Sequence, residues 1–256
     1  MSNLSKKLFI CFSAKDRYDI VQPVVYHLKN YGVDIWYDRY DMVMGDDRVK
    51  KNLEEGAGRC GYALIILSNN TVDSSCATEE IKILELRYKK RKVIIFPLLY
   101  ELKPCDIPPE FAWISNLIFK ETNRSAGTLE ICNHIACKIT HDILDNCRYR
   151  TISEIVNDRL QVLPSPVNSL LDRYTKVDHA NLNSRISLLY AAYLTIIESK
   201  KIVFDPLCEV PGKAFERLFS ETLLNLTIDY RELWLLENSL CVLINDYITS
   251  CTESNI

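Results

Sequence analysis

Tyr62-Ala-Leu-Ile-Ile-Leu67 is a stretch of six apolar residues, and the polar triplet Ser68-Asn-Asn70 follows it directly. A strand that is apolar on both faces is typical of a parallel sheet covered by helices on both sides. Similar runs occur at residues 8–12, 33–37 and 92–99, with a short fifth run at Leu117–Phe119. Helical patterns separate them at residues 19–31, 48–58, 74–90 and 127–147. The alternation predicts an α/β fold with a five-stranded parallel sheet.

The second half of the chain has a different pattern. From about residue 150 the β-rich runs disappear, and apolar residues recur at helical spacing in residues 186–197, 214–226 and 233–248. We therefore expect an α/β domain at residues 1–148 and an all-α region at residues 149–256. The role of this region stays open between an oligomerisation platform, a sensor of a trigger and a shield over a site on the first domain.

Composition limits the kinds of partner. The formal charge of −3 lacks the basic excess that binding to nucleic-acid phosphates requires. The local basic run Arg87–Lys92 is interpreted as a solvated helix end. No apolar stretch approaches the roughly 20 residues that span a bilayer. The polar residues 1–7 indicate no signal peptide, and ten cysteines without a Cys-x-x-Cys pair indicate reduced thiols. We expect a cytoplasmic protein that binds neither nucleic acid nor membrane.

Polar segments follow the predicted strands or open the next helix. They are Phe12-Ser-Ala-Lys-Asp16, Trp36-Tyr-Asp38 with Met44-Gly-Asp46, Leu67-Ser-Asn-Asn70, and Ser74-Ser-Cys-Ala-Thr-Glu-Glu-Ile81. Open α/β sheets bind ligands at the carboxyl ends of their strands, where these segments are expected to meet. The sequence therefore predicts a ligand site at this edge.

These segments resemble, in order, the motifs of the TIR domain family, and of its bacterial members in particular. An apolar strand followed by aromatic-Ser-x-x-Asp is matched by Phe9–Asp16, and Gly-x-x-x-Trp-x-Asp by Gly32–Asp38. The Gly-Asp of the next loop is matched by Gly45-Asp46. The motif Ser-x-Trp-x-x-x-Glu-apolar is matched by Ser74–Ile81, with Cys76 where Trp is usual. The resemblance covers about residues 7–147 and implies a flavodoxin-like sheet.

The resemblance also implies an activity. TIR domains of this kind hydrolyse or cyclise NAD⁺ with one glutamate of the last motif, which falls on Glu80. Glu79 is the fallback, because the missing Trp loosens the alignment. The implied enzyme is an NAD⁺ nucleosidase that gives ADP-ribose or a cyclic ADP-ribose. Such enzymes act in antiviral defence, and in Thoeris systems the cyclic product signals to a downstream effector. NAD⁺ is then the substrate, and no further cofactor is expected.

A single carboxylate suits this chemistry. Cleavage of the nicotinamide–ribose bond passes through an oxocarbenium-like sugar, whose positive charge a carboxylate can offset. Nicotinamide leaves as a neutral molecule, so no general acid is needed. We expect Ile81, Leu84 and Leu86 to mark the buried side of the helix, with Glu80 near its edge. The alternative is a first-turn glutamate that only complements the helix dipole.

Supporting roles are assigned by the same resemblance. Phe12 and Ser13 are expected to line the substrate site, while Trp36 is expected in the core. Asp38 and Ser68 are further substrate-binding candidates, with contacts to the following loop and a plain turn as their respective alternatives. Residues 39–47 correspond to a mobile loop that contacts other protomers in TIR enzymes; its candidate residues are Asp41, Met44, Gly45 and Asp46. Self-association is therefore expected.

Two other hypotheses stay open. The chain could be a TIR scaffold that only assembles with other TIR domains, or a nucleotide-responsive module without covalent chemistry. Separately, His134, Cys137 and His141 are spaced to share one helix face. We interpret this face as solvated and opposite the apolar one, and we expect no metal site because the spacing matches no zinc motif.

Overall fold

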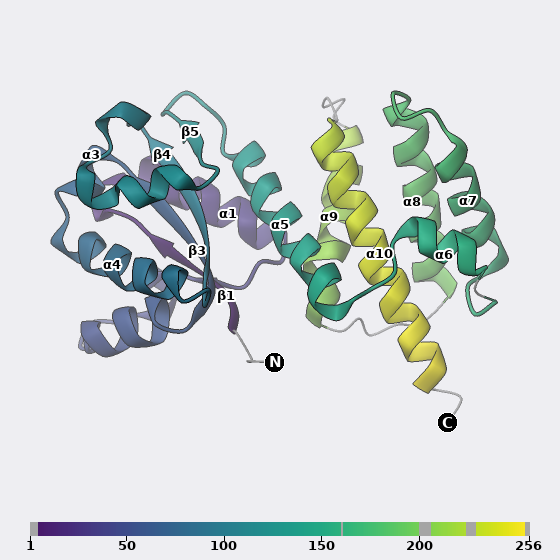
Figure 1. Cartoon of the computed structure of the whole chain (residues 1–256), viewed down its shortest axis with the longest axis horizontal. Coiled ribbons are helices and arrows are strands. Elements are labelled where there is room, and N and C mark those ends of the chain that lie inside the picture. Colours follow the sequence, from purple (N-terminus) through teal and green to yellow (C-terminus); the bar gives the residue numbers. More distant parts are fainter. Residues whose placement is uncertain (1–4, 160, 200–205, 224–228, 254–256) are drawn as a thin grey trace. The chain divides into compact units, whose positions relative to one another are not determined.

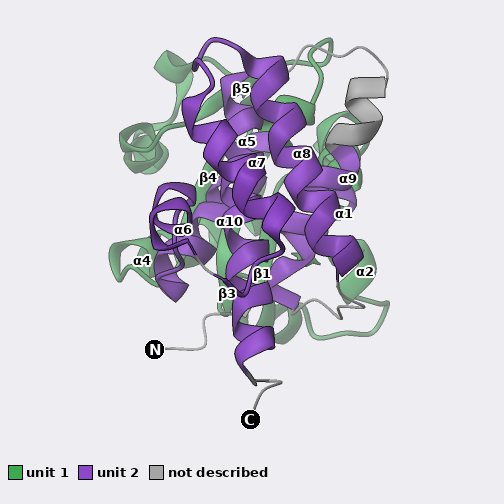
Figure 2. Ribbon diagram, turned by 90° about the vertical axis from the view of Figure 1, so that its right-hand side faces the viewer, with its two compact units in different colours: residues 1–29, 33–132 green, residues 30–32, 133–256 purple. Residues whose placement is uncertain are grey.

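The computed structural model describes residues 5–159, 161–199, 206–223 and 229–253. The chain divides into two compact units, coloured separately in Figure 2. The first comprises residues 1–29 and 33–132, and the second residues 30–32 and 133–256. The division lies within helix α5 (Leu129–Cys147). A domain boundary between residues 148 and 149 stays a prediction.

The first unit is built on a parallel five-stranded sheet, as predicted (Figure 1). Its strands are β1 (Ser5–Cys11), β2 (Ile35–Trp36), β3 (Cys60–Leu67), β4 (Ile94–Tyr100) and β5 (Lys120–Thr122). The strand order is β2-β1-β3-β4-β5, and each neighbouring pair is parallel. All five carboxyl ends therefore lie at one edge of the sheet.

Helical segments cover both faces of this sheet (Figure 1). They are η1 (Ala14–Asp16), η2 (Arg17–Val21), α1 (Gln22–Asn30), α2 (Asp38–Asp41), η3 (Val49–Ala57), α3 (Asn69–Val72), α4 (Ser75–Lys89), η4 (Pro104–Asp106) and η5 (Pro109–Asn116). On one face, Phe9 and Ile65 of the strands pack in one buried cluster with Ile81 of α4 and Ala57 of η3. This cluster fixes η3 and α4 beside each other at the carboxyl edge.

Three predictions about this unit need correction. The fifth strand is Lys120–Thr122, not Leu117–Phe119. Leu117 and Phe119 instead pack against the buried cluster, so their apolar character reflects core contacts rather than strand pairing. Leu86 is 59% exposed, because it lies about 200° around the helix from the buried Leu84. The loop at residues 38–47 contains the short helix α2.

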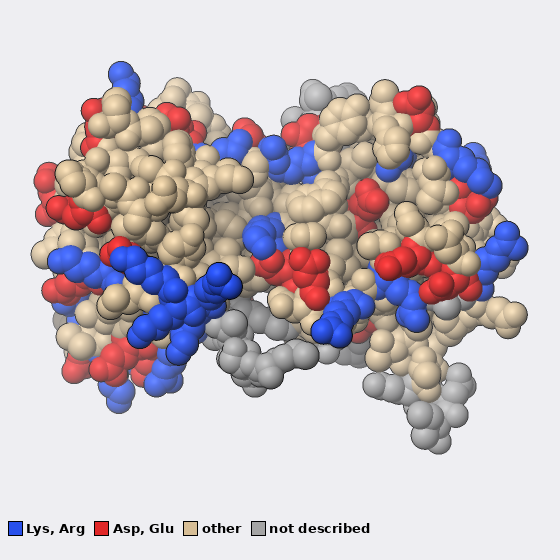
Figure 3. Space-filling model, in the orientation of Figure 1, with Lys and Arg blue, Asp and Glu red and all other residues tan. Residues whose placement is uncertain are grey.

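The basic run 87–92 is an exposed helix end, as predicted, except at Arg87. That residue is half-buried, and its guanidinium donates to the carbonyls of Ala57 and Cys60 at 2.6 Å. Lys89, Lys90, Arg91 and Lys92 are all exposed where α4 ends, and Figure 3 shows Lys and Arg side chains gathered near this end. Cations at the carboxyl end of a helix complement its dipole.

The second unit is all-α after α5. Its helices are α6 (Ile152–Asp158), α7 (Ser165–Lys176), α8 (Leu182–Ser199), α9 (Glu209–Leu223) and α10 (Tyr230–Glu253), with a short turn η6 (Pro206–Cys208). Residues 224–226 of the predicted helix 214–226 lie outside the described residues. Across the described helices, none combines the length and apolar character needed to cross a membrane.

Candidate functional site

Glu80 is a buried carboxylate at the carboxyl end of β1. It lies on α4, whose start is capped by the Ser74 hydroxyl, which accepts from the Ala77 amide at 3.3 Å. The side of α4 that packs on the sheet carries Ala77, Ile81 and Leu84, and Glu80 is on this side, only 7% exposed. Cys11, the last residue of β1, lies against the same turn, with its sulfur 3.7 Å from the Ala77 carbonyl.

The Glu80 carboxyl has two neutral polar neighbours. The side-chain amide of Asn52, on η3, donates to it, and the Cys11 thiol lies beside it at the end of β1. Burial raises the pKa of Glu80 to about 7, against the lowering effect of these two neighbours. The negative charge of Asp38 also raises this pKa, while the positive charge of Arg48 lowers it. A carboxyl tuned to neutral pH is a frequent feature of functional sites.

Glu79 has a different environment from Glu80. Its side chain is 49% exposed and accepts a hydrogen bond from Nη2 of Arg48 at 2.6 Å. Consecutive helical residues point about 100° apart, so the two carboxylates face different surroundings. The geometry favours Glu80 over the fallback Glu79 as the residue at the sheet edge.

A second cluster at this edge is centred on Arg17, which the sequence reasoning did not single out. Its guanidinium makes two 2.6 Å hydrogen bonds to Asp38 and one of 3.1 Å to the Tyr37 hydroxyl. Arg17 also lies over the half-buried ring of Phe12, 4.9 Å from its centroid, and Tyr37 packs beside that ring. Asp38 thus pairs with a cation from the segment after β1. The signal in the sequence for this pairing was position, because Arg17 follows β1, Asp38 follows β2, and these two strands are neighbours in the sheet.

Ser13 and Ser68 belong to buried turns. Ser13 caps η1, the turn that carries the buried Asp16. Asp16 accepts hydrogen bonds from the Ser68 hydroxyl at 2.5 Å and from Asn70 at 2.6 Å. Ser68 also caps α3 by accepting from the Thr71 amide at 3.0 Å. This network ties the loops after β1 and β3 together, and a substrate contact for Ser13 or Ser68 stays a prediction.

The predicted loop residues differ in how they are held. Asp41 accepts from the Tyr37 amide and from Lys7, so it is fixed to the sheet edge. Asp46 accepts from the Val43 amide within the loop. Gly45 has a φ of +101°, a conformation that favours glycine, and the Met44 side chain is fully exposed.

Comparison with known families decides what this domain is. A family model described as "TIR domain" matches residues 8–128, which include the whole sheet edge described above. Residues 8–128 form a TIR domain.

Curated relatives of this TIR domain have enzyme names. A 2′ cyclic ADP-D-ribose synthase from Bacteroides thetaiotaomicron, BtTIR, is 26% identical over 99 residues, which are 39% of this chain and 34% of the relative. An NAD(+) hydrolase from Escherichia coli O6:H1, TcpC, is 25% identical over 124 residues, 48% of this chain and 40% of the relative. The chain therefore spans well under half the length of these relatives.

A solved TIR domain was also matched, from the Toll-related receptor TRR-2 of Hydra magnipapillata. It has 15% identity and a TM-score of 0.37, and the match covers 44% of this chain and 82% of that one.

The residues around Glu80 of the TIR domain include three that sequence reasoning missed. Cys11, Arg48 and Asn52 come from the end of β1 and the start of η3. Each lies 28 or more positions from Glu80 along the chain, so no local spacing connects them. The signal in the sequence for this group was Asn52, a polar residue in an amphipathic helix.

The solvated face expected for His134, Cys137 and His141 is not observed. Cys137 is buried, and its thiol donates to the Arg231 carbonyl at 3.6 Å. The ring of His141 lies 5.2 Å from that of Trp234, also in the second unit. This face of α5 is not solvated because α10 covers it. Within the described ranges, no group of three or more His, Cys, Asp or Glu side chains is placed to hold a metal ion.

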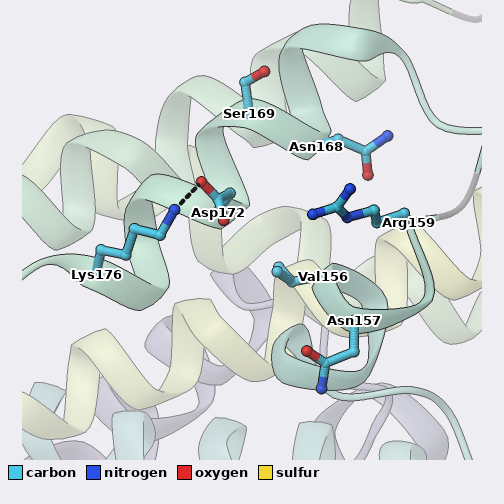
Figure 4. Close-up of a pocket in the computed structure, with 7 residues that line it drawn as sticks. All are labelled: Val156, Asn157, Arg159, Asn168, Ser169, Asp172 and Lys176. Atoms are coloured by element: carbon cyan, nitrogen blue, oxygen red, sulfur yellow. Dashed lines mark hydrogen bonds and ion pairs between the residues drawn. The ribbon is translucent and has the colours of Figure 1, made fainter.

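The helical unit has a polar hollow of its own, of about 680 Å³ (Figure 4). It lies between α6 and α7 and is lined by Val156, Asn157, Arg159, Asn168, Ser169, Asp172 and Lys176. Lys176 pairs with Asp172 at 2.6 Å, while Arg159 extends toward Asn168. It lies in the unit that does not contain Glu80.

Proposed function

We propose that the TIR domain cleaves the nicotinamide–ribose bond of NAD⁺ and that Glu80 is its catalytic residue. The observation that carries the proposal is a buried carboxyl at the carboxyl edge of the sheet, hydrogen-bonded by Asn52. The names of the curated relatives support NAD⁺ as the substrate.

The surroundings of Glu80 suit this reaction. A carboxylate shielded from water interacts more strongly with a developing sugar cation than an exposed one does. Its neighbours are an amide and a thiol, which favour the ionised form without neutralising its charge. The reaction needs the anionic form, since Glu80 stabilises positive charge and the leaving nicotinamide is neutral.

The Arg17 cluster is assigned a substrate-facing role in the same proposal. Phe12 offers a half-buried ring for stacking on a base, and Arg17 holds that ring and Asp38 in place. Ser13 and Ser68 are assigned to the same edge through their loops. The loop with Met44 is proposed to contact a second protomer, and the assembled enzyme to act in the cytoplasm in anti-phage defence.

The test is product analysis after incubation of the full chain with NAD⁺ at several protein concentrations. We expect nicotinamide to appear, together with either ADP-ribose or a cyclic ADP-ribose, which chromatography against standards separates. Hydrolysis gives the first co-product and cyclisation the second. Intact NAD⁺ at every concentration, from protein that forms oligomers, would favour the non-catalytic scaffold instead.

A further inference from the structure

Arg48 adds a positively charged side chain to the surroundings of the Glu80 carboxylate. Arg48 and Asn52 are four residues apart at the start of η3, and they contact consecutive residues of α4. Asn52 reaches Glu80, while Arg48 reaches Glu79 through Nη2 at 2.6 Å. Arg48 thus lies four residues from the side chain that holds Glu80 and pairs with the residue next to Glu80, and its positive charge lowers the pKa of Glu80.

One nitrogen of this guanidinium is unused. Nη1 of Arg48 is buried and has no hydrogen-bond partner among the described residues. A buried donor without an acceptor is costly, and native proteins rarely leave one in place. Arginine binds carboxylates and phosphates with two parallel N–H donors, and here only one of the two is occupied. Nη1 is therefore a donor whose hydrogen bond an anionic oxygen could supply once the Arg48 side chain turns away from Glu79.

Two other cations near this edge are already paired with side chains of their own. Arg17 uses both terminal nitrogens on Asp38 and Tyr37. Lys51, next to Asn52, pairs with Glu55 at 3.0 Å. Among the residues that the structure describes, Arg48 is held only by an exposed ion pair to Glu79, and exposed pairs of this kind contribute little stability. An incoming anion can therefore displace Glu79 from Arg48 at small cost.

We propose that Arg48 binds the pyrophosphate of the dinucleotide whose ribose lies at Glu80, and that Glu79 holds Arg48 when no substrate is bound. This inference rests on the proposed function, because it takes the substrate to be NAD⁺. The pyrophosphate is attached through the 5′ carbon of the same ribose whose C1′ carries nicotinamide. A cation near the carboxylate, but not paired with it, suits this spacing. Arg48 then positions the substrate and selects for a phosphate-bearing ligand.

The test measures binding of ADP-ribose to the full chain by calorimetry, which does not depend on turnover. The variants are Arg48→Ala, Glu79→Gln and a matched control, Arg59→Ala. Arg59 is an exposed arginine of the same unit that precedes β3 and so lies at the opposite, amino edge of the sheet. Thermal unfolding of each variant checks that the fold is retained.

We expect Arg48→Ala to weaken ADP-ribose binding by about tenfold or more, the usual effect of losing a hydrogen bond to a charged group. Glu79→Gln should strengthen binding by roughly two- to fivefold, because it removes the competing carboxylate. Arg59→Ala should bind as the wild type does. Equal binding by Arg48→Ala and Arg59→Ala would overturn the inference, and so would a wild type that does not bind ADP-ribose.

A kinetic comparison separates this inference from the proposed function. Nicotinamide riboside has the same scissile bond as NAD⁺ but no phosphate. In an active enzyme, Arg48→Ala should lower kcat/KM for NAD⁺ by about tenfold and change that for nicotinamide riboside by less than about twofold. Equal losses on both substrates would refute the role of Arg48 while leaving NAD⁺ cleavage intact. If ADP-ribose binding depends on Arg48 but the protein cleaves no NAD⁺, the role of Arg48 is supported and the proposed cleavage is contradicted.

Discussion

At the scale of single residues, the protonation of Glu80 connects the structure to a measurable rate. Burial raises its pKa to about 7, and the hydrogen bond from Asn52 acts in the opposite direction. Only the ionised form can stabilise a sugar cation. On the proposed function, the fraction of active protein therefore rises as the pH increases through the pKa of Glu80.

We predict that kcat/KM for NAD⁺ falls on the acid side of a midpoint near pH 7, since this parameter reports the pKa of the free enzyme. In Asn52→Leu the carboxylate loses a donor, so the midpoint should move up by about one pH unit. Rates measured from pH 5 to pH 9 check this. A profile lowered uniformly, with an unchanged midpoint, would show that Asn52 has only a structural role.

A second prediction at this scale concerns stability. The pKa of Glu80 is about 7 in the folded chain, against an ordinary value of 4.5 for a glutamate in water. Between these two values the folded state binds a proton that the unfolded state has lost, so stability falls as the pH rises from about 4.5 to 7. We predict that Glu80→Gln stabilises the first unit by about 3 kcal/mol at pH 8 and by little at pH 4.5. Denaturant unfolding at both pH values measures the difference. An equal effect at the two would contradict the raised pKa.

At the scale of elements, the close contact of η3 with the sheet depends on Gly56. A Cβ added there would lie 2.8 Å from Phe9 and 3.0 Å from Trp36, two buried rings that pack against each other at a tilt of 33°. We predict that Gly56→Ala destabilises the first unit by about 1–3 kcal/mol, the usual cost of overpacking. It should also lower activity, because η3 carries Asn52.

Gly212→Ala is the control for this prediction. Gly212 is also helical, and no atom of the described residues lies within 4 Å of an added Cβ. The loss of backbone entropy in the unfolded chain should then stabilise the protein by about 0.5–1 kcal/mol. Thermal unfolding measures both variants. A Gly56→Ala protein as stable as Gly212→Ala would show that η3 can move away from the rings.

How far the sequence determines these elements depends on burial. The strand at residues 62–67 was predictable because it is apolar at every position, as a central strand covered on both faces must be. The edge strand β5 was misplaced because it has a single neighbouring strand, β4, and its residues 120–122 are polar. The motif residues gave the position of Glu80. Its partners Asn52 and Cys11 could not be predicted, because tertiary packing alone brings them together.

At the scale of the whole molecule, the exposed loop after β2 is the proposed contact surface for self-association. Tyr40, Val43 and Met44 are exposed apolar side chains close together in sequence, and such groups are typical of interaction surfaces. We predict that activity per protomer rises with protein concentration, and that Met44→Asp shifts the rise to higher concentration. The control is Leu86→Asp, because Leu86 is also an exposed apolar residue but lies on α4. Activity strictly proportional to protein concentration would exclude a requirement for assembly.

The measurement that tests the central claim most directly is nicotinamide release from NAD⁺ by four proteins at equal concentration. They are the wild type, Glu80→Gln, Glu79→Gln and Glu85→Gln, a substitution on the same helix that keeps size and removes one charge. We predict that Glu80→Gln lowers the rate by about 10³-fold, the order of loss for a principal electrostatic group, while Glu79→Gln stays active and Glu85→Gln matches the wild type. Full activity in Glu80→Gln, or loss confined to Glu79→Gln, would contradict the assignment of the buried carboxylate as the catalytic residue.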